Sequence, residues 1–228
     1  MKLPLSFVVC FMKSILLFSA LLFVFQARSQ RGYFSFKVSY PLAGTPRELK
    51  SGMRASGFDN STTLIFSKDY PNSVKYPSVV VEGGRYINEK ISVSLLAGLQ
   101  EAGIVKGYNT NRGGITINYT NYVVNPKINF HRKSAILGIG PSALLLLYKK
   151  PPHQFGDYNH SKLLPGVSLS AESVSKKKRG FRFGVFSTLN LHPGFKIEHL
   201  IINSTYTQID FQSSLNPSAL NLGFRFQF

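Results

Sequence analysis

Apolar and polar residues alternate along much of this chain with a period of two. The alternation is strictest at the end of the sequence, where Leu220, Leu222, Phe224, Phe226 and Phe228 are apolar and the residues between them are small, amide or charged. Successive side chains of a β-strand point to opposite faces, so this spacing predicts a strand with one apolar face. The same spacing predicts further strands over residues 32–40, 78–87, 90–100, 115–131, 135–148, 166–172 and 181–190.

The connections between these strands alternate in length. Short ones are predicted near Asn88, Arg132 and Lys176–Arg179, whereas longer ones cover residues 41–77, 101–114, 149–163 and 192–217. No window shows a convincing amphipathic helix, and YTQIDFQ at 206–212 is interpreted as an extension within the last long loop. Short turns opposed to long loops are typical of an eight-stranded transmembrane β-barrel with both termini on the short-turn side.

Two of the predicted strands are irregular. Arg85 falls on the apolar side of its strand, which places it near a membrane boundary or at a bulge. In the strand over 115–131, the apolar residues change parity between Ile117 and Val124. That change requires either a bulge near Thr120 or a strand whose upper part lies clear of the membrane. Pro126 lacks a backbone donor and weakens the same strand.

Periodicity alone does not separate a membrane barrel from a soluble barrel or a sandwich, because each has one apolar strand face. Side-chain size favours the membrane barrel. The polar faces are rich in Gly, Ser, Asn and Thr, whereas the apolar faces carry Phe, Leu and Val. An eight-stranded barrel has an interior only wide enough for side chains to fill it. We therefore predict an all-β, eight-stranded antiparallel transmembrane barrel, with short periplasmic turns, long extracellular loops and the small polar face inside.

The N-terminus predicts export. Residues 14–25 are apolar, follow a basic start and precede Ala27-Arg28-Ser29, which fits a signal-peptidase site between small residues. The predicted organisation is a cleaved leader over residues 1–29 and a barrel domain over 30–228. An uncleaved anchor is the alternative, and translation from Met12 would leave a leader of typical length. The only cysteine, Cys10, lies in this leader, so the mature chain offers no thiol for a disulfide, a metal site or a nucleophile.

The chain is strongly basic, with a formal charge of +17 and a pI near 10.1. Loss of Lys2, Lys13 and Arg28 with the leader lowers the charge to +14. Such a charge fits nucleic acid, an acidic membrane surface or acidic saccharides. The most basic segment, ESVSKKKRG, lies between two predicted strands and is interpreted as a solvated hairpin, and no nucleotide-binding motif is present. Nucleic acid is therefore not an expected partner.

Several charged residues fall on the interior side of the predicted strands. We predict that they form a paired network that plugs the lumen, because unpaired buried charges are costly. Glu172 is expected opposite or diagonal to Arg182 across a short turn. The alternative is a narrow polar or anion-selective path. The residues of this network are Lys37, Glu82, Glu172, Arg182 and Arg225.

Catalytic chemistry finds little support in the sequence. The five histidines are scattered, and none pairs with another histidine or a carboxylate at the spacing of a metal site. Some small outer-membrane barrels modify lipids with a His and a Ser, a role for which His192 or His199 with Ser204 would be the candidates. Nothing in their spacing requires it. We expect a non-enzymatic protein with no metal and no cofactor.

The predicted leader, the eight strands and the terminal LGFRFQF together resemble small outer-membrane β-barrel proteins of the PorT-like and OmpX-like type. The resemblance implies a Gram-negative outer membrane and a last strand, marked by Phe224, Phe226 and Phe228, that is read by the barrel-assembly machinery. The resemblance indicates where the protein lies more firmly than what it does. We expect the long basic loops to bind a partner, a surface glycan or lipopolysaccharide, or the protein to be a component of an envelope export machine. A small-solute channel and a lipid-modifying enzyme remain the alternatives.

Overall fold

The computed structural model describes residues 32–42, 45–59, 70–149, 159–175, 181–203 and 208–228. The predicted leader with its cleavage residues Ala27 and Ser29, and the predicted turn over Lys176–Arg179, lie outside these residues. The elements run in the order β1 (Gly32–Pro41), α2 (Thr45–Ala55), β2 (Asn72–Tyr76), β3 (Ser78–Tyr86), β4 (Ile91–Asn109), β5 (Gly113–Arg132), β6 (Ala135–Lys149), β7 (Asn159–Val174), β8 (Arg182–Leu191), β9 (Phe195–Asn203), β10 (Gln208–Leu215) and β11 (Ala219–Gln227).

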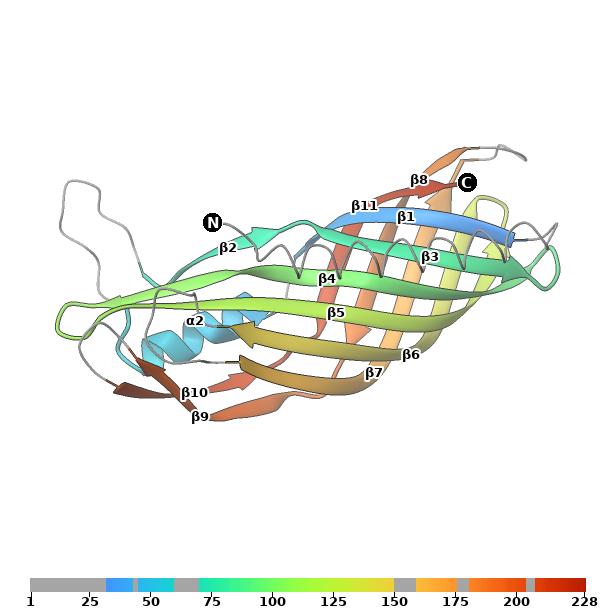
Figure 1. Ribbon diagram of the computed structural model, residues 1–228. Helices are drawn as coiled ribbons and strands as arrows, with labels where there is room; N and C mark the ends of the chain where they lie inside the picture. The colour runs from blue at the N-terminus through green and yellow to red at the C-terminus, as the bar shows by residue number, and fades with distance from the viewer. Residues whose placement is uncertain (1–31, 43–44, 60–69, 150–158, 176–180, 204–207) are drawn as a thin grey trace, which may run out of the picture.

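Eight antiparallel strands form a closed ring (Figure 1). Around the ring the order is β4, β3, β1, β11, β8, β7, β6 and β5, and pairing of β5 with β4 closes it. The first and last ring strands meet directly, with Lys37 of β1 opposite Arg225 of β11. The predicted eight-stranded antiparallel barrel is confirmed. The segment β2 pairs with β4 alongside its upper half, where Tyr76 lies opposite Ala102.

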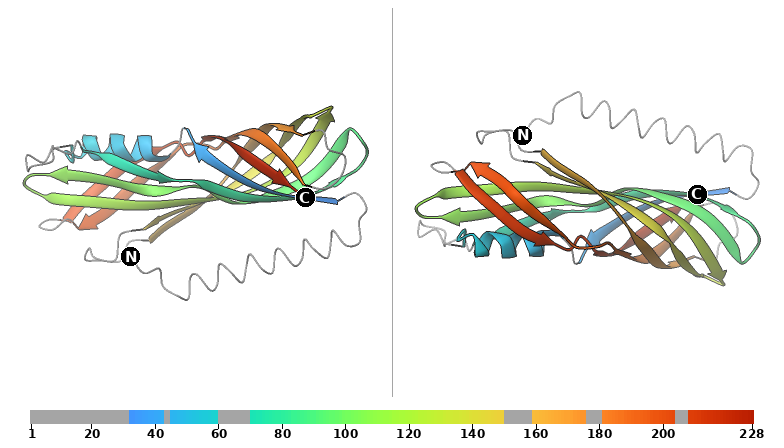
Figure 2. Two further views of the ribbon diagram at one scale, coloured as in Figure 1. Left: turned by 90° about the horizontal axis from the view of Figure 1, so that it is seen from above. Right: turned by 90° about the horizontal axis from the view of Figure 1, so that it is seen from below.

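The two ends of the ring differ. At one end lie the turn between β3 and β4, the turn between β5 and β6, the start of β1 and the end of β11. At the other end the β4–β5 hairpin extends beyond the ring, and α2 and the β9–β10 hairpin lie beside it (Figures 1 and 2). We call the first the short-turn end. The "cap" is everything beyond the Glu101–Asn121 pair, and the "lower barrel" is the ring between that pair and the short turns.

The connections at the cap end contain more regular structure than the sequence predicted. Residues 101–109 and 113–114 belong to β4 and β5, so the loop predicted over 101–114 is wrong except for a tight turn. The predicted absence of a helix is also wrong, because Thr45–Ala55 form α2. The segment β10 pairs only with β9 and stays outside the ring, as the interpretation of 206–212 required.

The lower barrel is largely polar inside, apart from buried apolar residues such as Val80, Leu96 and Val123, and it is apolar outside. Its outward side chains are exposed hydrophobics, with Leu137 59% and Phe224 53% exposed. Its inward side chains alternate with them and are buried. The buried inward set includes Ser35, Lys37, Glu82, Ser92, Ser94, Asn125, Lys127, Asn129, Ser168, Ser170, Glu172, Thr188, Asn190 and Arg225.

The cap has the opposite polarity. Its interior is a cluster of apolar and aromatic side chains from α2 and from β4, β5, β6, β9 and β10. Polar side chains such as Thr116, Thr120, Lys106 and Ser161 occupy outward positions on the same wall. The buried apolar set includes Leu49, Met53, Phe58, Val105, Ile115, Ile117, Tyr119, Leu146, Tyr148, Phe195 and Leu215.

The change of parity predicted within β5 has a simple origin. Every odd-numbered residue from Gly113 to Asn129 is buried, so β5 contains no bulge and its upper part continues into the cap. The irregularity lies in β4, where the register with β5 shifts between Leu99 and Glu101. The shift turns both Gln100 and Glu101 inward. The register through Arg85 is continuous with both neighbours of β3, so Arg85 marks the edge of the apolar face and not a bulge.

The helix α2 closes one side of the cap. It begins with Thr45-Pro46-Arg47-Glu48, which places a proline and an acidic residue in its first turn, as helix starts favour. Leu49 and Met53 are one turn apart and fully buried. A Cβ on Gly107 would lie about 3.0 Å from the Met53 sulfur and 2.8 Å from the Phe58 Cβ, so glycine in β4 lets the helix approach. Within the described residues, no helix combines the length and apolar character needed to cross a membrane.

Candidate functional site

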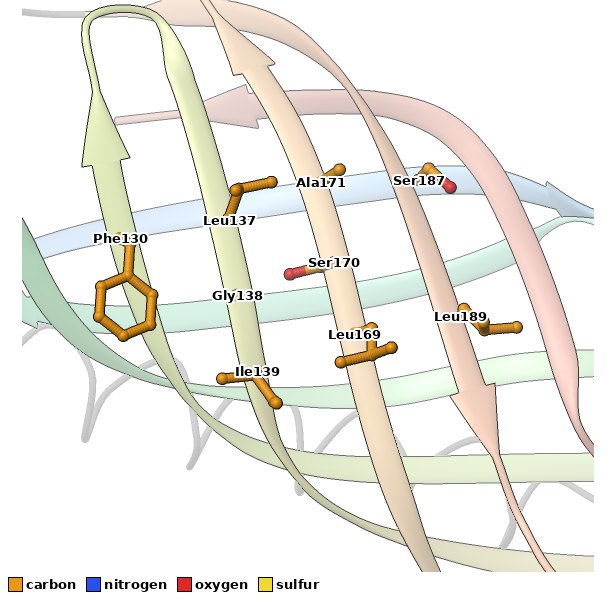
Figure 3. Close-up of a pocket in the computed structure, with 9 residues that line it drawn as sticks. All are labelled: Phe130, Leu137, Gly138, Ile139, Leu169, Ser170, Ala171, Ser187 and Leu189. Atoms are coloured by element: carbon orange, nitrogen blue, oxygen red, sulfur yellow. The ribbon is translucent and has the colours of Figure 1, made fainter.

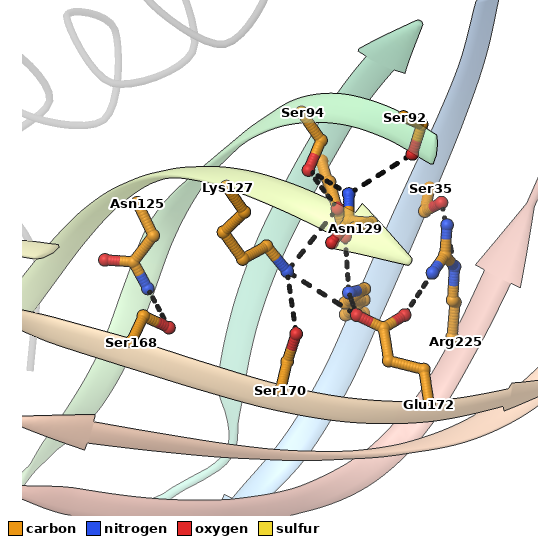
Figure 4. Close-up of polar contacts among 12 residues, drawn as sticks. Ser35, Ser92, Ser94, Asn125, Lys127, Asn129, Ser168, Ser170, Glu172 and Arg225 are labelled. Carbon is orange, nitrogen blue, oxygen red and sulfur yellow. Dashed lines mark hydrogen bonds and ion pairs between the residues drawn. The ribbon is translucent and has the colours of Figure 1, made fainter. Parts of the chain in front are cut away.

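Five charged side chains meet inside the lower barrel. Figure 4 labels Lys127, Glu172 and Arg225 among them. Lys37 contacts both carboxylates: its Nζ lies 2.6 Å from Glu172 Oε1 and also pairs with Glu82. Lys127 Nζ lies 3.4 Å from Glu82 and 3.5 Å from Glu172. Arg225 pairs with Glu172 through its guanidinium. We call these residues the "charge cluster".

The ring places these residues from opposite walls into one centre. Lys37 and Arg225 are direct neighbours across the β1–β11 pair, and Glu82 projects from β3 on the other side of β1. Glu172 and Lys127 come from β7 and β5. All five side chains are at most 5% exposed. Charged groups so deeply buried require partners, and each one has them.

The sequence predicted this cluster with one wrong member and one omission. Lys37, Glu82, Glu172 and Arg225 are brought together, whereas the predicted pairing of Glu172 with Arg182 is wrong. The β7–β8 register places Glu172 opposite Phe186, and Arg182 lies at the short-turn end of β8. Lys127 was missed, although it alternates with Ile128 and therefore points inward with its neighbours Asn125 and Asn129.

The charges are not balanced within the cluster. Lys37, Lys127 and Arg225 face two carboxylates. Neutral groups lie beside two of the three cations. Lys37 Nζ lies 5.2 Å from the centre of the Phe186 ring, Arg225 lies 5.4 Å from that of Tyr33, and Arg225 Nε donates to Ser35 Oγ at 3.0 Å. Ring faces and hydroxyls stabilise cations in a low-polarity interior.

Amide and hydroxyl groups fill the lumen on both sides of the cluster. Toward the cap, Asn125 donates to Asn190 Oδ1 at 3.0 Å, and Asn190 donates to Gln100 Oε1 at 2.7 Å. Toward the short-turn end, Asn129 donates to Ser94 Oγ at 2.8 Å, and Ser94 donates to Glu82 at 2.6 Å. Each of these hydrogen bonds joins two different strands, so together they connect the walls of the barrel across its interior.

The packing of this interior leaves a small cavity. A cavity of ≈ 10 Å³ lies between the cluster and the cap. That volume is close to the minimum that one water molecule needs. Three buried polar atoms without a hydrogen-bond partner belong to residues that line it: Gln100 Nε2, Thr188 Oγ1 and Asn221 Oδ1.

Glu101 occupies the junction between the lower barrel and the cap. Its Oε2 accepts a hydrogen bond from the backbone N–H of Thr45 at 3.2 Å and one from Asn121 Nδ2 at 3.4 Å. Burial raises the pKa of Glu101 to about 7, an effect that the Lys75 charge and these hydrogen bonds only partly offset. Its Oε1 and Asn121 Oδ1 are buried without a donor. The residue therefore ties the start of α2 to β4 and β5.

The candidate catalytic residues do not assemble into a site among the described residues. The ring of His192 is buried, with Nε2 3.2 Å from Ser142 Oγ and Nδ1 3.3 Å from the Pro165 carbonyl oxygen. Ser142 donates to Asn125 Oδ1 at 2.6 Å, so its hydroxyl belongs to the lumen network. Ser204 and the side chain of His199 lie outside the described residues. No group of three metal-ligating side chains occurs in the described part of the chain.

The outer wall carries a shallow apolar depression (Figure 3). It spans β5 to β8, has a volume of ≈ 410 Å³ and lies where the small side chains of Ala171 and Ser187 leave space between larger ones. Phe130 and Leu137 form one edge, and Ile139, Leu169 and Leu189 form the other. Among the residues that line it, only Ser187 brings a polar side chain to the outer wall, because the Ser170 hydroxyl is buried on the lumen side near Lys127.

The aromatic residues of β11 lie on the outer wall. Phe224 and Phe228 are exposed and Phe226 is half-buried. Phe224 stacks against Phe183 of β8 with ring centres 5.6 Å apart, and Phe228 contacts Phe181 at 5.4 Å. Arg225 between them points into the lumen. As predicted, this strand has an apolar outer face and a polar inner face.

Known proteins resemble this chain only in outline. No protein-family model matches the sequence, and no curated protein sequence matches it. The outer membrane protein OprG from Pseudomonas aeruginosa shares 9% identity over 88% of this chain and 97% of its own, with a TM-score of 0.47. Ail, the attachment invasion locus protein of Yersinia pestis, shares 9% identity over 88% and 100%, with a TM-score of 0.40. The outer membrane protein AlkL, solved in lipid bilayers, shares 10% identity over 88% and 91%, with a TM-score of 0.41. At these values the similarity does not extend to shared site residues or to a shared activity.

Proposed function

We propose that this protein is a membrane-embedded barrel of a Gram-negative outer membrane, with a closed lumen and a cap that binds ligands at the cell surface. The observation that carries the proposal is the inverted polarity of the lower barrel. Its outer face is a belt of exposed Phe, Leu, Ile and Val, whereas its interior holds buried charges and amides. A water-soluble barrel has the reverse arrangement, so lipid is the solvent that suits this outer face.

The edges of the apolar belt support the same placement. Tyr40, Tyr76 and Tyr122 lie on outward positions near the cap, where aromatic residues of membrane barrels meet the headgroups. Arg85 and Arg132 mark the other edge at the short turns. The membrane-spanning segments are thus the strand portions of the lower barrel, and Glu101 and the cap lie outside them. The cap then projects from the membrane, with its apolar side chains inside and its polar side chains facing water.

The closed lumen argues for a non-conducting protein. A permeating ion would meet the charge cluster, whose members are fully buried and paired from opposite walls. The hydrogen bonds on either side, such as those from Asn190 to Gln100 and from Asn129 to Ser94, would also have to open. The proposal contains no catalytic step, because His192 and Ser142 are both committed to hydrogen bonds inside the wall.

The cap provides the binding surface of this proposal. Arg47, Lys50 and Arg54 recur at helical spacing on the side of α2 turned away from the buried Leu49 and Met53. Lys106 adds an exposed cation on the outward face of β4. A basic helix face held on a rigid cap suits anionic groups, such as the phosphates of lipopolysaccharide or an acidic surface glycan.

The membrane placement is tested by gel mobility and conductance. Membrane-extracted protein should migrate differently before and after boiling, because a folded membrane barrel resists detergent. In planar bilayers the protein should give no steady openings. Equal mobility of boiled and unboiled samples would refute the stable membrane barrel, whereas steady openings would refute the closed lumen and support the channel alternative.

The binding role is tested on the cap itself. Wild-type protein should retain lipopolysaccharide in a salt-dependent manner. The triple variant Arg47→Gln, Lys50→Gln, Arg54→Gln should lose most of this retention, whereas the control variant Lys90→Gln, Arg132→Gln, Lys133→Gln at the other end should keep it. Equal retention by both variants would exclude α2 as the binding surface.

A further inference from the structure

We propose that the short-turn end carries a second interaction surface, a basic rim that binds the headgroups of anionic phospholipids. The inference rests on the proposed membrane placement. The rim consists of exposed cations from two neighbouring turns. They are Arg85 and Lys90 at the β3–β4 turn, and Arg132 and Lys133 at the β5–β6 turn.

The two turns are held side by side by the backbone. His131 N–H donates to the Lys90 carbonyl oxygen at 2.7 Å, and Ile91 lies opposite Phe130 across the β4–β5 pair. Lys90 is therefore adjacent to the strand end that carries Arg132 and Lys133. Asn88 fixes its own turn by accepting from the N–H groups of Lys90 and Ile91 at 2.8 Å. The cations are thus presented by tight, internally bonded turns.

The rim gathers positive charge without compensation inside the described part of the chain. No ion pair there involves Arg85, Lys90, Arg132 or Lys133. The acidic residue of these two turns is Glu89. Like charges close together repel, and the repulsion is relieved when phosphate groups of opposite charge lie nearby.

The direction of the side chains favours lipid over a partner protein below the barrel. Arg132 occupies an outward position of β5 two residues beyond Phe130, which is 50% exposed on the same face. Arg85 lies on the outward face of β3, two residues before Ile87, which follows the strand and is 56% exposed. These cations therefore flank the apolar belt on the wall of the barrel. At that height and direction, long basic side chains reach the headgroup layer of the surrounding leaflet.

The test measures whether the full-length protein prefers an anionic lipid over a zwitterionic lipid in the bilayer around it. Wild-type protein is placed in phosphatidylcholine vesicles that contain spin-labelled phosphatidylglycerol or spin-labelled phosphatidylcholine. We expect the charged lipid to associate about threefold more strongly at low salt, and the preference to disappear near 1 M salt, where the Debye length falls to about 3 Å.

Two variants with equal charge loss locate the effect. The rim variant Arg85→Gln, Lys90→Gln, Arg132→Gln, Lys133→Gln should show no preference. The cap variant Arg47→Gln, Lys50→Gln, Arg54→Gln, Lys106→Gln should keep it. All eight side chains are exposed or half-exposed, so neither variant is expected to unfold.

The outcomes separate this inference from the proposed function. Protein that inserts into the vesicles but shows no lipid preference overturns the basic rim and leaves the membrane barrel intact. Protein that fails to insert overturns both. Wild-type protein that ignores phosphatidylglycerol but binds polyglutamate through the rim residues overturns the lipid assignment in favour of an acidic protein partner.

Discussion

The lower barrel and the cap share strands β4, β5, β6 and β7, but the lower barrel buries mainly polar side chains and the cap buries apolar ones. In the lower barrel, the inward positions of β5 are Val123, Asn125, Lys127 and Asn129, whereas in the cap they include Ile115, Ile117 and Tyr119. The backbone of β5 is continuous through the change. Polarity is therefore set by the surroundings of each section and not by the type of element. The lower barrel needs internal partners for its charges, and the cap needs α2 and the β9–β10 hairpin to cover its apolar interior.

The charge cluster is where the lower barrel should be most sensitive. Glu172→Ala would leave Lys37, Lys127 and Arg225 with Glu82 as the remaining carboxylate of the cluster. Breaking a buried ion network by removing one partner costs about 3–5 kcal/mol. Urea unfolding in lipid vesicles, followed by the loss of the fast-migrating unboiled band, measures it. Glu89→Ala in an exposed turn should change stability by about 0.5 kcal/mol or less. Equal effects would mean that the cluster does not hold the lower barrel together.

A charge introduced on the outer wall should destabilise the lower barrel more than the cap. Phe224→Arg places a cation between Val38 and Val185 on the apolar face, and it should cost about 2–4 kcal/mol if that face lies in lipid. Ser161→Arg, on the outward face of β7 in the cap, should cost little because that position meets water. Folding yield into vesicles and unfolding midpoints compare the two. Similar losses would contradict the assignment of the two walls to different solvents.

The junction should make the cap sensitive to pH. The folded-state pKa of Glu101 is raised to about 7, above its ordinary value of 4.5. The protonated form therefore favours the folded junction, and this stabilisation is complete below pH 4.5 and is lost as the pH rises through 7. The loss is on the order of 3 kcal/mol at most. The charge of Lys75 of β2 lowers the pKa of this carboxyl group, and the Glu101 charge in turn raises the pKa of Tyr119 of β5.

Limited proteolysis of the connection after α2 measures this loss. Cleavage should be faster at pH 8.5 than at pH 5.5 in wild-type protein. In Glu101→Gln the amide cannot ionise, so the rate should no longer depend on pH in this range, apart from the change in protease activity that a reference substrate corrects. A variant with the wild-type pH dependence would show that another group, such as His192, controls the junction.

Much of the lower barrel could be predicted from sequence because each strand is in contact with only two environments. The alternation of Phe224 with Arg225, and of Phe36 with Lys37, reflects one face toward the outside and one toward the lumen. Four members of the charge cluster followed from this parity. Arg182 was included wrongly because parity gives the face of a residue but not its height, and the β7–β8 register sets the height.

The cap was predicted poorly for a physical reason. Beyond the bulge at Gln100 and Glu101 the interior becomes apolar, so outward and inward positions such as Ile104 and Val105 no longer differ in polarity. The alternation that identifies a strand then disappears. For α2 a local signal was present, since Thr45-Pro46 and Glu48 form a helix start, but its apolar face is narrow and consists mainly of Leu49 and Met53.

The smallest expected effect concerns the surplus cation of the cluster. Lys127 makes the longest contacts, 3.4 Å to Glu82 and 3.5 Å to Glu172, and its removal would leave two cations facing two carboxylates. Lys127→Met keeps a side chain of similar length, so the lost attraction and the relieved repulsion should nearly cancel, within about 1 kcal/mol of either sign. Lys37→Met is the matched control, because Lys37 bridges both carboxylates and its loss leaves Glu82 with Lys127, at 3.4 Å, as its remaining cation in the cluster. The unfolding midpoint in urea should therefore fall clearly for Lys37→Met and remain nearly unchanged for Lys127→Met. Equal losses for the two variants would mean that all three cations are needed and that the cluster holds no surplus charge.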